Sequence, residues 1–501
     1  MSALTPRAKS LALVLLAMTQ FVIVIDASIV NVALPSIGAH LHFSRDDLTW
    51  VVNAYTLTFG GFLLLGGRMA DLLGRRRMFM LGLVVFSLAS LAGGLAQSET
   101  WLIAARAVQG LGAAIVSPAA LSIITTTFAD GPERNRALGI WGAVAGAGGA
   151  AGVLLGGILT SGLSWRWVLF VNVPIGLIAA ALAPRTLRES RREMGSHPPN
   201  SFDIPGAVTV TGGLALLVYA VVDAVNVGWG ATRTIVCLIV SVVLLIAFVA
   251  IERRQRDPLM PFEIFRLGTL RGANVVGLLI GLSLFSMFFF ISLYLQDVMG
   301  YSPIKTGLAY LPLAGGIIIA AGVASQLVTR VGFKAPLIAG ILLVAGGLLW
   351  FSHLPATGGS FTTDVLGPSL LAGVGFGLAF VPVTIAAVTG TRPHQAGLAS
   401  GLINTSQQVG GALGLAILAT IANRRTQSLL HAGVHSSAVA LTKGYDRAFL
   451  VGAGLAVTGA ILAAVLISSR DSHQHSKPAR NSKAEAAAAG ADAPAVPVTA
   501  G

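Results

Sequence analysis

The sequence predicts an all-α integral membrane protein with fourteen transmembrane helices, and three observations lead to this fold class. Hydrophobic residues make up 54% of the 501 positions and charged residues only 11%, whereas soluble domains carry about 25% charged residues. The 60 glycines suit helices that approach one another closely in lipid. Fourteen apolar runs of roughly 18–25 residues also have the length needed to cross about 30 Å of hydrocarbon. In chain order the runs are 11–34, 49–67, 78–96, 101–124, 137–160, 167–184, 205–224, 234–251, 272–295, 305–328, 335–353, 365–388, 400–421 and 448–468.

The distribution of basic residues predicts how these helices are oriented. Lysine and arginine total 33 against 20 acidic residues, which gives a net charge of +13. With the N-terminus inside, 24 of the 33 lie in cytoplasmic segments, 8 lie in outer loops and Arg106 lies within a helix. This threefold excess follows the positive-inside rule and places both termini in the cytoplasm. The basic charge therefore indicates membrane topology and not a nucleic-acid surface.

Two polar cytoplasmic segments, 185–203 and 252–271, divide the helices into groups of six, two and six. The final segment is polar and then rich in Ala and Pro, so it cannot bury enough apolar surface to fold. We therefore expect four parts: an N-terminal six-helix bundle (1–184), linkers with two additional helices (185–271), a C-terminal six-helix bundle (272–468) and a disordered cytoplasmic tail (469–501).

The two six-helix bundles are expected to be copies of one repeat. The connection after the second run, GGRMADLLGRRRMFMLG from Gly66, aligns with ASQLVTRVGFKAPLIAG from Ala324 at an offset of 258 residues. Four pairs of positions then coincide: Gly74 with Gly332, Arg76 with Lys334, Gly82 with Gly340, and Asp71 with Thr329. Only the last pair differs in chemistry, which suggests that the second copy has lost the role of the acid.

Two charged residues inside apolar runs give the strongest functional signal. Asp26 lies in the first run and Arg106 in the fourth, and a charge at the bilayer centre costs roughly 2.5–3.5 kcal/mol. Asp26 is eight residues from the outer end of its run and Arg106 is five residues from the outer start of its own, which places them about 12 and 8 Å deep. We therefore expect the two side chains to meet if their helices are neighbours.

A protonatable group paired inside a membrane is what a proton-coupled carrier needs. Arg106 stays protonated at accessible pH, so Asp26 is the expected carrier and Arg106 tunes it. A neighbouring guanidinium favours the charged carboxylate, whereas burial favours the neutral acid. A conformational change that alters this balance would let Asp26 bind a proton outside and release it inside. The alternative is a static ion pair that fixes the register of two helices.

We expect no cofactor and no enzymatic activity. The single Cys237 lies in an apolar run and all nine histidines fall in loops or tails, so the helices offer no metal or haem ligand set. The sequence has no glycine-rich phosphate loop for ATP. A membrane enzyme would need clustered His, Asp or Glu near one face, and a sensor would be expected to carry a sizeable soluble domain. The expected energy source is the proton motive force, worth about 2.3 kcal/mol per charge that crosses 100 mV.

Four segments of the N-terminal third resemble motifs of one transporter family. The sequence GxxADxxGRRR at 67–77 resembles motif A of the major facilitator superfamily, and LIAARAVQGLGAA at 102–114 resembles its motif B. IDASIVNVALPSI at 25–37 and WRWVLFVNVPIG at 165–176 resemble the first-helix motif and the helix 5–6 region of its fourteen-helix drug:proton antiporters. The resemblance implies the major facilitator fold, in which two six-helix halves rock about a midplane cavity.

The resemblance also implies roles for particular residues. A carboxylate at Asp71 can face a helix N-terminus or an arginine and hold the cytoplasmic side closed; the alternative is a loop that only anchors positive charge inside. The gating residues of motif A are Gly67, Asp71, Gly74, Arg75 and Arg76, and motif B adds Gln109 and Gly110. In the fifth run Gly152, Gly156 and Gly157 occupy the place of the antiporter motif C, although Gly152-Val153 replaces its Gly-Pro pair.

Polar residues elsewhere in the helices are candidate substrate contacts. Asn53 and Tyr55 in the second run are possible pocket residues. Asn404 and Gln407 offer neutral amides, which bind by hydrogen bonding without attracting a cation. This favours neutral, zwitterionic or monocationic amphiphiles over dications. Asp297 is either a second proton or substrate site or a solvated acid at a helix end.

Together these features predict a secondary active multidrug or antibiotic efflux transporter. It would export small amphiphilic compounds in exchange for protons by alternating access, in a bacterial plasma membrane. Its partners would be the drug-like substrate, protons and the lipid bilayer, without nucleic acid, and we expect a monomer. The alternatives are a dedicated exporter of one endogenous metabolite and an importer with the same fold.

Overall fold

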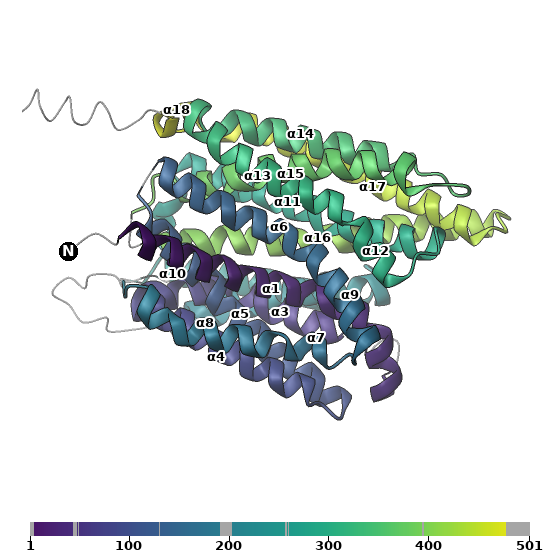
Figure 1. Ribbon diagram of the computed structural model, residues 1–501, viewed down its shortest axis with the longest axis horizontal. Coiled ribbons are helices and arrows are strands. Elements are labelled where there is room, and N and C mark those ends of the chain that lie inside the picture. The colour runs from purple at the N-terminus through teal and green to yellow at the C-terminus, as the bar shows by residue number, and fades with distance from the viewer. Residues whose placement is uncertain are drawn as a thin grey trace, which may run out of the picture.

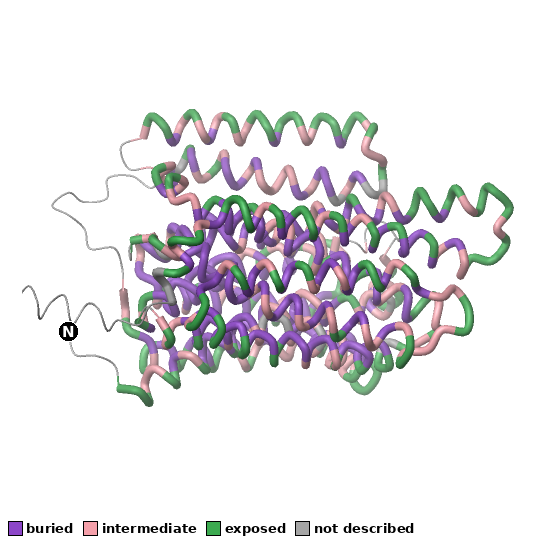
Figure 2. The backbone as a smooth tube through the Cα atoms, turned by 90° about the horizontal axis from the view of Figure 1, so that it is seen from above, coloured by how far each residue is buried: buried purple, intermediate pink, exposed green. Residues whose placement is uncertain are grey.

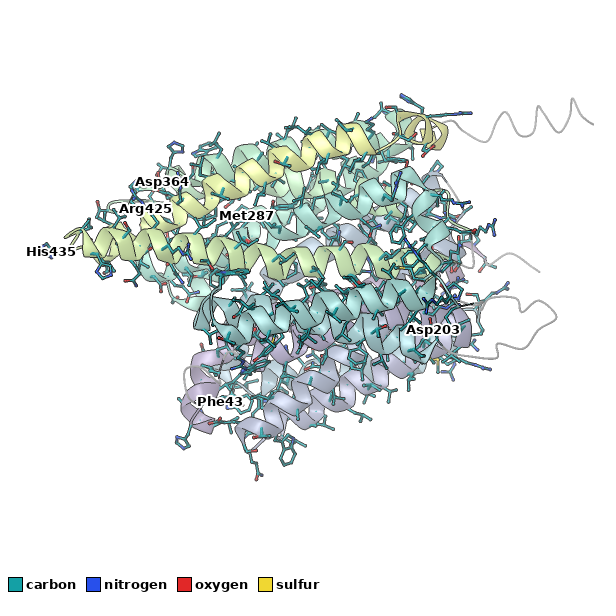
Figure 3. The ribbon with its side chains drawn as sticks, turned by 180° about the vertical axis from the view of Figure 1, so that it is seen from behind. Phe43, Asp203, Met287, Asp364, Arg425 and His435 are labelled. Carbon is teal, nitrogen blue, oxygen red and sulfur yellow. The ribbon has the colours of Figure 1, made fainter. Side chains whose placement is uncertain are left out.

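The helices of the computed structural model run side by side along one direction (Figure 1). Within the part of the chain that the structure describes, every regular element is helical, which confirms the all-helical fold class. The start of α1 (Pro6–Leu41) and the last helix, α18 (Ser469–Ser476), lie at the same end of the bundle, here called the termini end (Figure 1). Asp203 lies at that end, whereas Phe43 and His435 lie at the opposite end (Figure 3). The described residues are 5–43, 48, 50–129, 131–190, 203–255, 258, 260–392 and 395–476.

The N-terminal half contains one helix that is broken within the predicted run 167–184. The break falls at Val171, three residues before Pro174, which has no N–H to donate to the carbonyl of Phe170. The dihedral angles of Val171 stay helical and Trp167–Thr186 remains one membrane-length span, so the break is the loss of a backbone hydrogen bond at Pro174 within the single helix that the sequence predicted. The half consists of α1, α3 (Trp50–Leu73), α4 (Arg75–Gly94), α5 (Glu99–Thr127), α6 (Pro132–Gly162), α7 (Trp167–Phe170) and α8 (Asn172–Thr186).

A hairpin of two helices, α9 (Ile204–Val227) and α10 (Thr232–Glu252), separates the two halves in the sequence. The short helix η1 (Phe262–Arg266) follows it, and two π-helical segments lie in the C-terminal half, η2 (Tyr294–Val298) and η3 (Phe361–Val365). The α-helices of that half are α11 (Gly268–Leu293), α12 (Pro303–Ala309), α13 (Leu311–Val331), α14 (Lys334–Phe351), α15 (Leu366–Val388), α16 (Ala396–His431), α17 (Ser437–Leu466) and α18.

Twelve of the described helical segments are long and apolar enough to cross a membrane, so the count falls short of the predicted fourteen. The other two predicted runs are helical, but α9 falls short in the length of its described apolar stretch and α16 in its apolarity. In α9 the apolar stretch extends over Pro205–Val221. In α16 the amides and hydroxyls of residues 404–408 and the arginine pair at 424–425 lower the hydropathy.

The predicted repeat is present in the packing. Helices α4 and α5 pack together in the first half as α14 and α15 do in the second. Gly82 lies against α5 and Gly340 lies against α15, each at a point where an added Cβ would come within 3 Å of backbone atoms. Gly74 and Gly332, which precede α4 and α14, have φ of 108° and 81°, a region that favours glycine. The aligned glycines therefore serve the same purpose in both halves.

The two halves meet mainly through α3 with α16 and through α6 with α13. These pairs are equivalent by the repeat, since α3 corresponds to α13 and α6 to α16. Helix α9 packs against both α3 and α16, and α10 packs mainly on α9. The hairpin therefore lies at the periphery. The outer surface of α10 is apolar, with exposed side chains at Ile235, Val236, Ile239, Val240, Val242, Val243 and Ile246.

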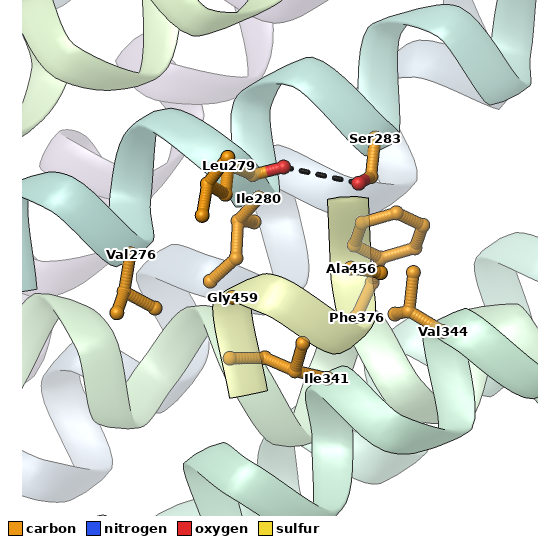
Figure 4. Close-up of a pocket in the computed structure, with 9 residues that line it drawn as sticks. All are labelled: Val276, Leu279, Ile280, Ser283, Ile341, Val344, Phe376, Ala456 and Gly459. Carbon is orange, nitrogen blue, oxygen red and sulfur yellow. Dashed lines mark hydrogen bonds between the residues drawn. The ribbon is translucent and has the colours of Figure 1, made fainter. Parts of the chain in front are cut away.

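Buried residues follow the inward faces of the helices and exposed residues follow the outer faces (Figure 2). A small apolar cavity lies inside the C-terminal half, where Ser283 donates its hydroxyl to the carbonyl of Leu279 at 3.0 Å (Figure 4). It has room for about one water molecule. A cavity of this size does not hold a drug-sized compound.

The predicted disordered tail was wrong at its start. Residues 469–476 form α18, which packs against α13. Ser472 Oγ accepts a hydrogen bond from the backbone N–H of Lys334 at 2.9 Å, and Thr269 Oγ1 donates to Asp471 Oδ2. These bonds hold the segment to the beginning of α14 and α11. Residues 477–501 of the predicted tail and 191–202 of the predicted linker lie outside the described residues.

Replacing Gly66 by Ala should destabilise the N-terminal half. A Cβ at Gly66 would overlap the carbonyl oxygen of Ala114 on α5, and such overpacking costs about 1–3 kcal/mol. Gly454→Ala is the matched control, because Gly454 lies within α17 with open space around its Cβ position. Thermal unfolding in detergent, followed by circular dichroism, should give a lower midpoint for Gly66→Ala and an unchanged or higher one for Gly454→Ala. Equal midpoints for Gly66→Ala and wild type would contradict the close α3–α5 contact.

Candidate functional site

Asp26 and Arg106 meet in the interior of the N-terminal half, as their depths in the sequence predicted. Asp26 lies on α1 and Arg106 on α5, and Arg106 Nη1 donates to Asp26 Oδ2 at 2.7 Å. Their side chains are 0% and 1% exposed. Protein groups alone must therefore compensate both charges, and a buried ion pair survives only where further hydrogen bonds satisfy its remaining atoms.

Two amide side chains hold the other carboxylate oxygen of Asp26. Gln109 Nε2 donates to Asp26 Oδ1 at 2.8 Å, and Asn172 Nδ2 donates to the same oxygen at 2.7 Å. Arg106 Nη1 also donates to Gln109 Oε1 at 2.7 Å. Ser90 Oγ accepts from Gln109 Nε2 at 3.0 Å and from Asn172 Nδ2 at 3.1 Å. Hydrogen bonds to an ionised group are about twice as strong as neutral ones, so these donors stabilise Asp26 as a carboxylate.

Four helices bring these side chains together. Arg106 and Gln109 share a face of α5 because they are three residues apart. Asn172 is the first residue of α8, directly after the break at Val171. Ser90 on α4 donates its hydroxyl to the carbonyl of Leu169 in α7 at 2.9 Å. The position of Asn172 therefore depends on the broken helix and on its contact with α4.

The rest of the Arg106 guanidinium contacts α3. Nε donates to the carbonyl of Val51 at 3.0 Å, and the group lies 4.4 Å from the centre of the Tyr55 ring. Arg106 Nη2 and the Tyr55 hydroxyl are buried and have no hydrogen-bond partner among the described residues. Such atoms carry a free-energy penalty that a further partner, such as water or substrate, would relieve.

The arrangement is one in which a proton on Asp26 would change the hydrogen bonding around it. Arg106, Gln109 and Asn172 all donate to Asp26, and a proton on Asp26 would remove the charge that Arg106 compensates. Proton binding at Asp26 and the positions of Arg106, Gln109 and Asn172 would therefore be linked, since a change in one alters the free energy of a change in the other.

The motif A acid connects the two halves at the termini end. Asp71 is 1% exposed and accepts hydrogen bonds from the backbone N–H groups of Gly397 at 3.2 Å and Leu398 at 3.1 Å, in the first turn of α16. A carboxylate at a helix N-terminus is stabilised by the unpaired N–H groups and the helix dipole. Gly67 allows this approach, because a Cβ there would lie 2.6 Å from the carbonyl oxygen of Gly397.

The basic residues of motif A bind acids of their own half. Arg75 Nη2 donates to Asp71 Oδ1 at 2.8 Å. Glu189, at the end of the described linker, accepts from the backbone N–H groups of Arg76 and Arg77 at 3.2 Å each. Glu189 therefore caps the N-terminus of α4, and Gly74 lies directly against its carboxylate. The predicted gate residues Gly67, Asp71, Gly74, Arg75 and Arg76 thus form one assembly with Glu189.

The remaining motif glycines lie at close helix contacts. Gly110 faces α3, where an added Cβ would overlap Thr58 and the carbonyl of Tyr55. Gly152 and Gly156 face α1, and Gly157 faces Ile304 on α12 in the other half. The motif C region therefore packs closely without its proline.

The other candidate substrate residues do not join the Asp26 network. Asn53 is half-buried on α3, and Asp297 is exposed in η2. Asn404 donates to the carbonyl of Ser400 in its own helix at 2.9 Å. Gln407 packs against Gly281 of α11 and its amide nitrogen has no hydrogen-bond partner among the described residues. Of the five candidates, only Tyr55 contacts the network, through Arg106.

Three residues of the site were missed in the sequence. Asn172 is the one amide or charged side chain in the apolar run 167–184, and this isolation was a usable signal. Ser90 is one of several small residues in its run and gives no comparable signal. Glu189 lies in a linker with several charges, where only the fold selects it.

Comparisons with known proteins find one family. The profile of the Major Facilitator Superfamily matches residues 16–415. The puromycin resistance protein pur8 of Streptomyces alboniger is 40% identical over 468 residues, with 91% of each chain covered. The cephamycin export protein CmcT of Amycolatopsis lactamdurans is 42% identical over 457 residues, with 91% of this chain and 92% of the relative covered. The crystal structure of the human organic anion transporter MFSD10 shares the fold, with a TM-score of 0.64 at 15% identity over 92% of this chain and 100% of that one.

Asp71→Asn should weaken the contact between the halves at the termini end. The amide keeps one acceptor oxygen but loses the charge that α16 and Arg75 stabilise, which costs about 1–2 kcal/mol and shifts an open–closed equilibrium roughly tenfold. Spin labels at Arg185→Cys and Val331→Cys, in a Cys237→Ser background, would report the separation by pulsed electron paramagnetic resonance. The expected result is a larger population of long distances.

Glu189→Gln is the matched control for this experiment. It removes a similar charge from a helix N-terminus, but α4 belongs to the same half as Glu189. We expect Glu189→Gln to lower the stability of the protein without changing the distance between the spin labels on the two halves. An unchanged distance distribution in Asp71→Asn would show that this carboxylate does not hold the halves together.

Proposed function

This chain belongs to the Major Facilitator Superfamily, and from that premise we propose that it exports small amphiphilic, antibiotic-like compounds in exchange for protons. The family makes it a multi-pass membrane transporter and not an enzyme. Two relatives that cover nine-tenths of the chain carry names of antibiotic resistance and export, for puromycin and cephamycin. The proposed substrate is therefore a small, amphiphilic, antibiotic-like compound.

The buried pair of Asp26 and Arg106 carries the proposal of proton coupling. Two charges that are at most 1% exposed pay a large desolvation penalty, and a buried pair rarely adds net stability. Ionisable residues within membrane segments are accordingly rare and mostly functional. An ion pair that only fixed the helices would not need neighbouring side chains that can switch between donating and accepting hydrogen bonds. The amides of Gln109 and Asn172 can donate or accept, and this supports a site that changes its protonation state.

The proposed cycle uses alternating access. Asp26 binds a proton when the site faces outside, and the loss of its charge weakens the hold of Arg106, Gln109 and Asn172. The halves then move about the contacts of α3 with α16 and of α6 with α13. Release of the proton inside restores the carboxylate, and the substrate leaves in the opposite direction. Asp71 on the first turn of α16 acts as the latch of the termini end, which the charge distribution places in the cytoplasm.

Fourteen membrane spans are part of this proposal. Helices α9 and α16 have 24 and 36 residues, enough to cross the bilayer at about 1.5 Å per residue. With them the six-two-six order of spans is complete and both termini lie on one side. We propose that the chain resides in a bacterial plasma membrane with both termini in the cytoplasm.

A dedicated exporter of one compound is the second candidate. The names of pur8 and CmcT each refer to one antibiotic or antibiotic class, and this favours a narrow substrate range. The neutral amides of α16 suit a neutral or singly charged compound. A multidrug pump and a dedicated exporter share the proton site and differ only in the range of compounds.

Asp26→Asn should abolish proton-driven export. A pump-deficient bacterial host would express wild type or variant at matched membrane levels, and its growth would be measured against puromycin and a panel of structurally different antibiotics. Resistance should appear with wild type and vanish with Asp26→Asn, because an amide cannot carry the proton. The number of antibiotics to which the wild type confers resistance distinguishes a multidrug pump from a dedicated exporter.

Asp223→Asn serves as the control for this experiment. Asp223 also lies in a helix and pairs with Arg233 at 3.3 Å, but Arg233 is 59% exposed, and exposed pairs contribute about 0–1 kcal/mol. Its variant should retain resistance. Resistance that survives Asp26→Asn would move the proton site elsewhere, and no resistance to any compound would oppose the proposed export.

A further inference from the structure

We propose that Asn172 is a positioning residue that selects the charge state of Asp26, with Ser90 setting which end of its amide faces the carboxylate. The proposal rests on the proposed proton coupling at Asp26. It concerns a residue outside the Asp–Arg pair, on the helix that follows a break.

The geometry fixes the orientation of the Asn172 amide. Its Nδ2 donates both to Asp26 Oδ1 at 2.7 Å and to Ser90 Oγ at 3.1 Å, so both N–H bonds are used. The side chain is 1% exposed, which excludes water as an easy substitute. A carboxylate needs a donor, and the amide nitrogen therefore faces Asp26. The Asn172 oxygen makes no hydrogen bond to any described residue.

Asn172 differs from Gln109 in its freedom to turn. Gln109 is bonded at both ends of its amide, because its oxygen accepts from Arg106 at 2.7 Å. A rotation of Gln109 would break the bond to Arg106. Rotation of the Asn172 amide would give up its two Nδ2 hydrogen bonds but no bond of its oxygen, and it would present that oxygen to Asp26. A protonated Asp26 needs such an acceptor for its O–H, and Asn172 can serve both charge states.

The backbone links this amide to helix movement. Asn172 begins α8 immediately after the break at Val171, and Ser90 on α4 bonds the carbonyl of Leu169 before the break at 2.9 Å. Ser90 therefore contacts both sides of the break, through Leu169 and through the Asn172 amide. A shift of α7 or α8 relative to α1 would alter the donor that Asp26 receives. Proton affinity at Asp26 is thereby coupled to the position of the broken helix.

Infrared spectroscopy tests the proposal without any substrate. The C=O stretch of a protonated carboxyl group is followed in the purified protein in lipid as pH is varied, and Asp26→Asn assigns the band. Asn172→Leu keeps a side chain of similar size but removes a donor to the carboxylate. It should shift the midpoint of this band to higher pH by about one to two units. Ser90→Ala should shift it in the same direction by less, because Asn172 and Gln109 each lose an acceptor while both amides can still donate to Asp26.

Ser87→Ala is the matched control. Ser87 lies one turn before Ser90 on α4, is 0% exposed and has no hydrogen-bond partner among the described residues, so its midpoint should equal that of wild type. If Asn172→Leu fails to fold, the comparison of Ser90→Ala with Ser87→Ala decides. Midpoints of the Asn172 and Ser90 variants equal to wild type, or no titrating band in any of these proteins, would overturn the proposal. A failure of export itself would leave the infrared midpoints unchanged, so the two proposals fail separately.

Discussion

A charge that is kept away from water must be solvated by protein groups, and the arrangement of the N-terminal half depends on this requirement at Asp26. Its carboxylate receives Arg106 and Gln109 from α5 and Asn172 from α8. Leaving a buried charge without its partner costs about 3–5 kcal/mol, so α1, α5 and α8 must keep their register. Small residues make this register possible, since Gly110 and Gly152 let α5 and α6 approach α3 and α1 closely.

The same requirement is met at the termini end with backbone donors. Asp71 lies on the first turn of α16 and Glu189 lies on the first turn of α4. In both places a carboxylate uses N–H groups that the helix itself leaves unpaired. The two acids nevertheless do different work. Glu189 fixes a loop within its own half, whereas Asp71 joins one half to the other.

The sequence was sufficient where a single residue or a regular spacing carried the information. The apolar runs located the helices, and the depths of Asp26 and Arg106 predicted their contact. The predicted count of fourteen spans is not confirmed, because twelve of the described helical segments have the length and apolarity of a membrane span. The partners of Asp26 could not be predicted in full. Asn172 and Ser90 reach it through a helix break and through packing between distant segments, and neither is encoded in local spacing.

The acids of the N-terminal half that lie at helix N-termini are not repeated at the equivalent positions of the C-terminal half, although the fold is repeated. At the position equivalent to Asp71, Thr329 bonds the carbonyl of Gln326 in its own helix at 2.6 Å, and Ser472 replaces a carboxylate at the N-terminus of α14. The carboxylates of the N-terminal half therefore have no counterpart at these two positions of the C-terminal half. Helix α3 connects the buried pair with α16, since Val51 and Tyr55 contact Arg106 and Asp71 contacts α16. Asp71 lies sixteen positions after Tyr55, which corresponds to about 24 Å of continuous helix. One continuous helix thus joins the buried pair to the contact between the halves.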